Sequence, residues 1–287
     1  MATRSAGAKR FKPSTTPEPP TGRGPQRDRP RRRRYAVVYD TDGPLVRLGV
    51  LWFVLAITVM AVGPLPTALL YGGVAAVAAA QTAHAWRRPD RRDRVEPRPN
   101  GLMAAAIAGG MAVGACLGAG GAGLALLVGV AAAVAVATGD SASSNPAVVD
   151  AGWTIQCALP PGFAVMSVVL LARLDQGSAI ALLLLVSAYE TGDYLVGSGA
   201  GNAVEGPLAG LCALLVLTFI VSALPISTLS FAQAWFLGGC VAVLAPVGQL
   251  VASGLLPTAG ARASALRRLD SLLLAAPIWC LGVGLVL

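Results

Sequence analysis

The sequence predicts an all-α, polytopic membrane protein whose amino terminus lies in the cytoplasm. Of its 287 residues, 55% are hydrophobic and only 13% are charged, whereas roughly a quarter of the residues of an ordinary soluble domain are charged. Long apolar runs such as residues 45–62 contain a single charge, Arg47. A helix of about 20 such residues spans the hydrocarbon core of a bilayer. Together these observations predict a bundle of about nine membrane-spanning helices.

A basic segment, residues 1–43, precedes the apolar region. It is rich in Pro, Gly, Thr and Arg and contains the run Arg31–Arg34. Such a composition buries too little apolar surface to offset the entropy of ordering, and it has no apolar stretch directly after a short basic start, as a secretory signal would. We expect a disordered cytoplasmic tail. Its arginines either bind anionic lipid headgroups or serve only to fix the topology.

The remaining chain, residues 44–287, is predicted to form one transmembrane domain. Short turns that contain Gly or Pro, such as Gly63-Pro64 and Gly118–Gly121, separate its apolar segments. We interpret the Gly-rich stretches as places of close helix packing and not as phosphate-binding loops. The segments expected to cross the bilayer are 44–62, 66–86, 101–118, 121–138, 151–172, 177–197, 207–224, 228–252 and 269–287.

The orientation follows from the basic residues, because short cytoplasmic loops hold the excess of Lys and Arg. With a cytoplasmic amino terminus and nine crossings, 21 of the 22 basic residues fall on the cytoplasmic side, and Arg173 is the exception. The carboxyl terminus is then expected on the outer side. The same topology places the polar loops 139–150 and 198–206 in the cytoplasm, where a water-soluble substrate would be met.

The net charge of +8 does not indicate a nucleic-acid partner, since over half of the basic residues lie in the first 47 positions. Membrane lipids are the expected partners. The only histidine, His84, ends an apolar segment beside Trp86 and Arg87, so we interpret it as an interfacial residue and not as part of a triad or a metal centre. Because the five cysteines lack paired spacing, we interpret them as small buried hydrophobic residues: Cys116, Cys157, Cys212, Cys240 and Cys280.

Acidic residues within or at the mouths of the spanning helices are the candidates for chemistry, because a charge at the bilayer centre costs at least about 2.5 kcal/mol. Four residues qualify: Glu190, Asp193, Glu205 and Asp270. The spacing of Glu190 and Asp193 predicts that both lie on one helix face, near the cytoplasmic end. Such a pair could hold a divalent cation with substrate phosphates. Alternatively, the pair lies in the headgroup zone, or one member pairs with a cytoplasmic arginine.

Asp270 follows Arg267 and Arg268 and stands just before the last apolar run. On composition alone we expect it to cap the amino terminus of the last helix, where a carboxylate accepts orphan backbone N–H groups. The two arginines would then mark the cytoplasmic edge of the membrane.

Three blocks in the last third of the chain stand out by their order: AYETGDYLVG (188–197), VEGPLAGL (204–211) and LRRLDSLLLAAPIW (266–279). They resemble successive blocks of the phosphatidate cytidylyltransferase (CDP-diacylglycerol synthase) family of polytopic membrane enzymes. The similar region extends over residues 177–287. In the first block Glu190 stands where the family has Asp, and Glu205 opens the Glu-Gly of the second. The third is similar to the closing signature Leu-Asp-Arg-Leu-Asp-Ser-Leu-x-x-Ala-x-Pro and includes Asp270.

The resemblance implies about nine helices and transfer of a cytidylyl group from CTP to phosphatidic acid, giving CDP-diacylglycerol and pyrophosphate. It implies Mg²⁺ at the cytoplasmic side, catalysis by Asp270 and Glu190, and metal binding by these two residues with Asp193. It also implies a multi-pass protein of the cell (plasma or inner) membrane, and related enzymes are often homodimers. The substrate-binding residues would be Glu205, Arg268, Ser271 and Asn202.

Several positions depart from the family pattern. Asn202-Ala203 replaces a Lys-Thr pair, Gly248-Gln249 replaces Gly-Asp, and Arg267 replaces the first Asp of the closing signature. The loss of carboxylates and lysines leaves two hypotheses: a divergent cytidylyltransferase in which Asp193 replaces a lost carboxylate, or a catalytically degenerate member that acts as a membrane scaffold or regulator. A transporter with an acidic ion path is the least favoured reading, because no paired half-repeat is present.

Overall fold

The computed structural model describes residues 45–87, 98–140, 145–198, 201–202, 204–224, 228–258 and 261–286, with side chains from residue 49 onward. Within these ranges the chain is helical and contains no strand, which confirms the predicted all-α class. The basic segment 1–43 lies outside the described residues, so the predicted disordered tail stays a prediction. The helices, in chain order, are α1 Leu45–Val62, α2 Pro64–Trp86, α3 Gly101–Ala115, α4 Ala119–Gly139, α5 Ala147–Leu174, α6 Gln176–Gly197, α7 Glu205–Ala223, α8 Phe231–Gly254, α9 Ser264–Arg267 and α10 Leu272–Val286.

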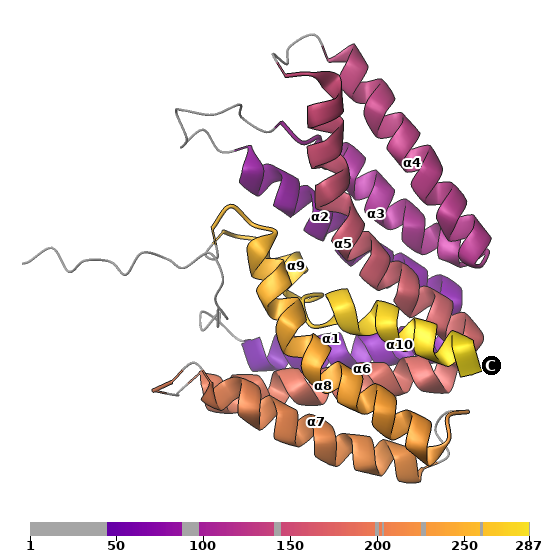
Figure 1. Cartoon of the computed structure of the whole chain (residues 1–287), viewed down its shortest axis with the longest axis vertical. Helices are drawn as coiled ribbons and strands as arrows, with labels where there is room; N and C mark the ends of the chain where they lie inside the picture. Colours follow the sequence, from indigo (N-terminus) through magenta and orange to yellow (C-terminus); the bar gives the residue numbers. More distant parts are fainter. Residues whose placement is uncertain are drawn as a thin grey trace, which may run out of the picture. The chain divides into compact units, whose positions relative to one another are not determined.

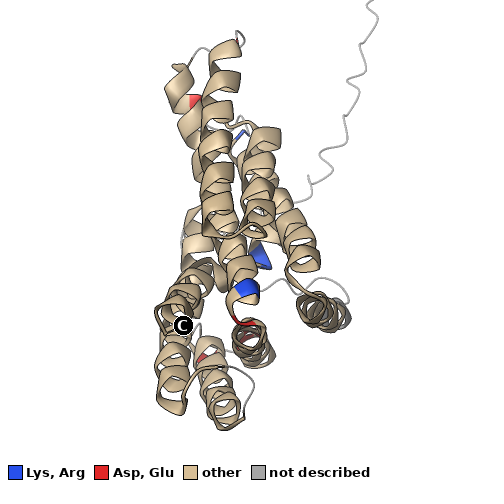
Figure 2. Cartoon of the chain, turned by 90° about the vertical axis from the view of Figure 1, so that its right-hand side faces the viewer, with Lys and Arg blue, Asp and Glu red and all other residues tan. Residues whose placement is uncertain are grey.

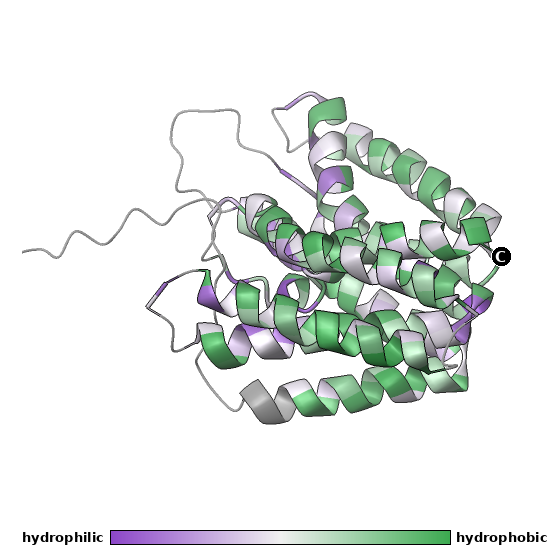
Figure 3. Cartoon of the chain, turned by 60° about the horizontal axis from the view of Figure 1, so that its bottom comes forward, coloured by the Kyte–Doolittle hydropathy of each residue, from purple (hydrophilic) through white to green (hydrophobic). Residues whose placement is uncertain are grey.

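Six of the described helices are long and apolar enough to cross a bilayer, namely α2, α4, α5, α6, α7 and α8. Three further apolar stretches are shorter: Gly49–Val62, which is the part of α1 with described side chains, Gly101–Ala115, which is α3, and Leu272–Val286, which is α10. Each of the nine predicted segments therefore contains a helix, while nine crossings and a cytoplasmic amino terminus remain predictions. Hydrophobic residues cover most of the helix surfaces (Figure 3), and charged positions are sparse along the helices (Figure 2). These properties indicate a membrane protein.

The helices pack mainly as neighbours in the chain. Helix α2 packs against α3 and α5, α3 packs against α4 and α5, and α6 packs against α7, which in turn contacts α8. Helix α10 lies between these groups, because it contacts both α5 and α8. In Figure 1, α2, α6 and α8 end at the left of the view, whereas the carboxyl terminus lies at the right. This arrangement places the ends of α6 and α8 close to α9, where the acidic candidates lie.

Some predicted boundaries were wrong. Helix α5 begins at Ala147, so Asp150 is in its first turn and not in a loop. The Asp150 side chain is buried, and its Oδ1 accepts hydrogen bonds from the Arg98 backbone N–H at 3.3 Å and from Asn145 Nδ2 at 2.9 Å. The predicted segment 269–287 was also too long, since α10 begins only at Leu272 and a separate short helix, α9, precedes it.

Close packing of small residues accounts for one Gly-rich stretch. A Cβ built on Gly114 of α3 would lie 2.6 Å from the backbone oxygen of Gly121 in α4, so the two helices can touch only where both residues lack side chains. The turn between them contains Gly118 at φ +99°, a conformation that residues with a Cβ rarely adopt. The interpretation as a place of close helix packing is confirmed for Gly121, whereas a Cβ on Gly118 or Gly120 would meet no atom within 4 Å.

The cysteines were predicted too uniformly. All five thiols are free, but only Cys157 is buried, and Cys212 on α7 is exposed. Because the outer surface of a membrane bundle faces lipid, an apolar thiol is tolerated there as well as in the core. The remaining three are half-buried: Cys116, Cys240 and Cys280. His84 lies exposed in the last turn of α2, near the end of the helix as expected.

One carboxylate connects two helix junctions at the end of the bundle opposite the acidic candidates. Asp175 caps α6: its Oδ1 accepts from the Gly177 N–H at 3.1 Å, and its Oδ2 accepts from Ser178 Oγ at 2.6 Å. The same Oδ2 accepts from the N–H and the hydroxyl of Thr228, at 3.1 and 3.0 Å. Partial burial favours the neutral carboxyl, but these hydrogen bonds outweigh it and lower the pKa of Asp175 below its usual value.

Candidate active site

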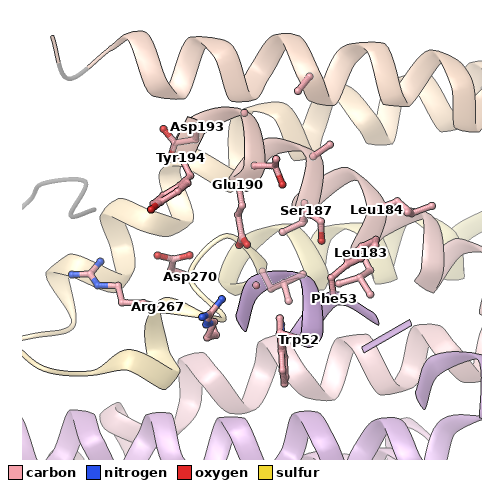
Figure 4. Close-up of a pocket in the computed structure, with 18 of the residues that line it drawn as sticks. Trp52, Phe53, Leu183, Leu184, Ser187, Glu190, Asp193, Tyr194, Arg267 and Asp270 are labelled. Carbon is pink, nitrogen blue, oxygen red and sulfur yellow. The ribbon is translucent and has the colours of Figure 1, made fainter. Parts of the chain in front are cut away.

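A cavity of about 980 Å³ lies where α1, α2, α6, α7, α8 and the segment around α9 meet. One side is polar and is formed by acids and arginines, namely Glu190, Asp193, Arg267, Arg268 and Asp270. The other side is apolar and is formed largely by aromatic and aliphatic residues of α1 and α6, among them Trp52, Phe53, Leu183 and Leu184. Figure 4 shows the Glu190 side chain extending from α6 into this space, with Asp270 and Arg267 on one side of it and Trp52 and Phe53 on the other.

The cavity reaches the surface of the bundle. Val50 of α1 and Leu195 of α6 line it, yet these residues are 59% and 67% exposed. An apolar, exposed rim at a charged cavity suits a ligand with a polar head and an apolar tail.

Glu190 and Asp193 both line the cavity, which confirms that they share one face of α6. Glu190 interacts electrostatically with Asp270 and, more weakly, with Asp193. The sequence separates Asp270 from α6 by 73 positions or more, so the fold brings the three carboxylates to one cavity. Burying like charges near one another is unfavourable unless a cation or a proton compensates them.

The backbone turn that carries Asp270 approaches α8 very closely. A Cβ on Gly248 of α8 would clash with the backbone oxygen of Asp270. The Asp270 side chain is 7% exposed, and its Oδ1 accepts hydrogen bonds from the Ser271 N–H at 2.7 Å and from Ser271 Oγ at 3.3 Å. Asp270 lies two residues before Leu272 and accepts from Ser271, which precedes α10, so the interpretation of Asp270 as the cap of α10 stays a prediction, while its side chain also faces the cavity.

Ser271 and the two arginines surround this carboxylate pair. Besides its contact with Asp270, the buried Ser271 side chain interacts with Glu190. Arg267 Nη1 donates a hydrogen bond to Ser253 Oγ of α8 at 2.9 Å, and its charge stabilises ionised Asp270. Arg268 is exposed at the cavity and interacts with Glu190. The site thus combines carboxylates that attract a metal with cations that attract phosphate.

Gln249, which stands at a position where the resembled family has Asp, holds Asp193 in a buried network. Gln249 Nε2 donates to Asp193 Oδ2 at 3.3 Å, and the Tyr189 hydroxyl donates to Gln249 Oε1 at 3.4 Å. All three side chains are at most 7% exposed. One oxygen of Asp193 therefore already has a protein partner, and this engagement reduces what Asp193 can offer to a metal.

Two expected substrate-binding residues lie apart from the cavity. Asn202 precedes α7 and donates from Nδ2 to Glu205 Oε1 at 2.9 Å, and Glu205 is the first residue of that helix. Both side chains are exposed, and neither lines the cavity. The substrate-binding role expected for this pair therefore rests on the resemblance and not on proximity to the other acids.

The glycines of the family-like blocks allow α6 and α7 to cross closely. A Cβ on Gly192 would lie 2.8 Å from the Ala209 backbone oxygen, and one on Gly210 would lie 2.6 Å from the Tyr189 backbone oxygen. This crossing fixes the segment of α6 that carries Glu190 and Asp193. The two glycines thus help to position the acids, and Gly192 itself also lines the cavity.

Helices α1 and α2 contribute residues to the cavity that were not predicted from the sequence. Trp52, Phe53 and Tyr71 line the cavity, but each stands within an apolar run in which an aromatic residue is ordinary. No spacing or charge pattern distinguishes them from lipid-facing neighbours. Their role at the cavity becomes visible only when α1 and α2 are placed against α6.

The fit of a metal ion can be judged from these donors. Among the described residues, no group of three or more His, Cys, Asp or Glu is arranged to hold a metal. Mg²⁺ does not need such a group, because it commonly takes one or two carboxylates and completes its shell with water and substrate phosphates. Glu190 and Asp270, which face one cavity and interact with each other, fit that mode of binding.

The fold and the cavity define a class: a helical membrane protein with a cavity that has both charged and apolar walls. Comparison with protein families gives the particular assignment. The sequence model of the Cytidylyltransferase family matches residues 45–285, which is most of the chain. The chain therefore belongs to the cytidylyltransferase family, and the resemblance to phosphatidate cytidylyltransferases is confirmed over a longer region than 177–287. No curated protein matches the sequence significantly.

Proposed function

We propose that the protein transfers CMP from CTP to phosphatidic acid in the cell (plasma or inner) membrane. The observation that carries this proposal is the amphipathic cavity, which places a carboxylate pair and two arginines next to an apolar wall in a member of the cytidylyltransferase family. A lipid phosphate has both kinds of surface. CTP would meet the charged end of the cavity from the cytoplasm, as the predicted topology requires.

The reaction forms one phosphoanhydride bond and breaks another. A phosphate oxygen of phosphatidic acid attacks the α-phosphorus of CTP, the bond between that phosphorus and the oxygen bridging to the β-phosphate breaks, and pyrophosphate leaves with the electron pair. The chain's own part is to position the two phosphates and to balance their charges. Arg268 is the exposed cation at the cavity, and Ser271 keeps Asp270 and Glu190 in place.

Glu190 and Asp270 are the residues that we propose to hold Mg²⁺, with Asp193 as a further ligand. When bound, the ion would neutralise phosphate charge and orient the triphosphate. Asn202 and Glu205 would contact substrate only at the rim, since they do not line the cavity. The protein would act as a homodimer or a monomer with one such cavity per chain.

The test is CTP-dependent formation of CDP-diacylglycerol by purified protein in detergent with magnesium. We expect Asp270→Asn to lower turnover at least about 100-fold, which corresponds to roughly 2.7 kcal/mol of lost transition-state stabilisation. The matched control is Asp140→Asn, because Asp140 is an exposed residue outside the cavity. Turnover that survives in the Asp270 variant of well-folded protein would rule out its role in catalysis.

A second candidate function is that of a catalytically degenerate scaffold or regulator in the membrane. Two observations favour it: Gln249 binds Asp193 where a carboxylate is expected, and Arg267 adds a positive charge beside Asp270. Both changes weaken a metal site. The wild-type assay separates the candidates, because a scaffold would bind phosphatidic acid or a partner enzyme but would release no pyrophosphate with any lipid phosphate.

A further inference from the structure

One hydroxyl in the described part of the chain is buried without a hydrogen-bond partner. Tyr71 on α2 is 1% exposed, and its Oη has no partner there. The only comparable atom in the described ranges is Trp279 Nε1 on α10. A buried polar group that lacks a partner is unfavourable, so such groups usually mark a place where water or a ligand binds.

The two unpartnered atoms differ in their surroundings. Tyr71 lines the cavity of the candidate active site, whereas Trp279 does not. The Tyr71 hydroxyl is also close enough to Glu190 for an electrostatic interaction. The ring is held in place by Trp52, which packs edge-on against it with centroids 5.7 Å apart and an interplanar angle of 64°. A rigid donor therefore stands beside the carboxylate that we propose to hold the metal.

The position of Tyr71 indicates the kind of acceptor it would meet. Its neighbour Trp52 belongs to the apolar wall, and Glu190 belongs to the charged side, so Tyr71 stands at the border between the two. A ligand that fills both sides presents its polar head at this border. For a lipid phosphate, the group found there is a phosphate oxygen, which accepts hydrogen bonds strongly.

We infer that Tyr71 is a positioning residue whose hydroxyl donates a hydrogen bond to the phosphate of the lipid substrate. This inference rests on the proposed function for its choice of lipid. The same donor could serve a phosphate of CTP, and the experiment below distinguishes these two sources. Helices α1 and α2 then contribute a specific contact to a site whose charged residues all come from the second half of the chain.

The test uses Tyr71→Phe, which removes only the hydroxyl. Because that hydroxyl has no partner among the described residues, we expect the variant without ligand to unfold at the same temperature as the wild type or higher. We expect KM for dioleoyl phosphatidic acid to rise about tenfold, equivalent to about 1.4 kcal/mol, with KM for CTP unchanged. The comparison variant is Tyr189→Phe. The hydroxyl that it loses donates a hydrogen bond to Gln249, so we expect this variant without ligand to unfold at a lower temperature than the wild type.

A binding measurement keeps the inference testable even if the protein has no transferase activity. Dioleoyl phosphatidic acid should raise the unfolding temperature of the wild type more than dioleoylglycerol, which lacks the phosphate, and Tyr71→Phe should lose that difference. This outcome without turnover would support the inference and contradict the proposed reaction. Three results would overturn the inference: an equal response of the wild type and Tyr71→Phe to phosphatidic acid, no phosphate-dependent stabilisation of the wild type, or a rise in KM for CTP alone.

Discussion

At the scale of single residues, the candidate site depends on one position that has no side chain. Gly248 lets the turn around Asp270 press against α8, and the hydrogen bonds of Ser271 then fix the carboxylate at the cavity. The closeness of that contact makes Gly248 a geometric requirement and not merely a flexible residue. The acid it positions lies 22 residues further along the chain, so no local pattern reveals the dependence.

Gly248→Ala should therefore damage the site. A Cβ there would meet the backbone oxygen of Asp270, and overpacking of this kind typically costs about 1–3 kcal/mol. We expect turnover, or phosphatidic acid binding, to fall along with a lower unfolding temperature. Gly239→Ala on the same helix is the control, since a Cβ at Gly239 would meet no atom within 4 Å. Helix propensity alone favours Ala in both variants, so similar behaviour of the two would refute the steric argument.

The residues of the site were partly predictable. The spacing of Glu190 and Asp193 was enough to place both on the cavity face of α6. By contrast, the separation of Asn202 and Glu205 from the cavity depends on where α7 begins. Tyr71 could not be singled out, because a missing hydrogen-bond partner is a property of packing between helices and not of sequence. The roles of Glu190, Asp193 and Asp270 in metal binding stay predictions.

At the scale of helices, apolar length predicted where the helices are, but polar residues decided where they end. Helix α5 extends to Ala147, and Asp150 and Thr154 in its first two turns accept hydrogen bonds from the backbone N–H groups of the segment before α3. The last apolar run is broken before Leu272, where Leu269, Asp270 and Ser271 form a turn. Hydropathy averages over such positions, and this is why the predicted segment began at residue 269 and α10 begins only at Leu272.

The junction at Asp175 gives an element-scale prediction about pH. The folded pKa of Asp175 lies below its unfolded value, so its hydrogen bonds stabilise the fold fully above the unfolded pKa, which is about 4. This contribution is lost as the pH falls through the folded pKa. We expect Asp175→Asn to unfold at a lower temperature than the wild type at pH 6 and the difference to shrink below pH 4.

Thermal unfolding in detergent over this pH range measures the effect. Thr228→Ala removes one of the donors to Asp175, so the double variant should be less destabilised than the sum of the two single variants. A gap between wild type and Asp175→Asn that is constant from pH 6 to pH 3 would show that the charge of Asp175 does not contribute.

At the scale of the whole molecule, the cavity joins the two halves of the chain. The three acids come from α6 and the α9–α10 turn, while the apolar wall includes α1 and the unpartnered hydroxyl comes from α2. The family match begins at residue 45, although the recognisable motifs begin only at 188, so it includes the helices that contribute the apolar wall. An apolar run in which aromatic residues are ordinary offers no motif, and this is why the resemblance was limited to the last third of the chain.

The topology gives the prediction at this scale. In a variant whose five cysteines are replaced by alanine, single cysteines can be placed at Leu224 between α7 and α8, at Arg262 before α9, and at Val286 at the end of α10, all of which are exposed. Nine crossings with a cytoplasmic amino terminus place Arg262 inside and the other two outside. A membrane-impermeant thiol reagent applied to intact cells should therefore label the cysteines at 224 and 286, and should reach the one at 262 only after permeabilisation.

Labelling at 224 but not at 286 would mean that the short helix α10 does not cross the bilayer, and it would leave an even number of crossings. The cavity would keep its charged end on the side of Arg262 in either case, because Arg267 at the end of α9 and Arg268 directly after it both line the cavity.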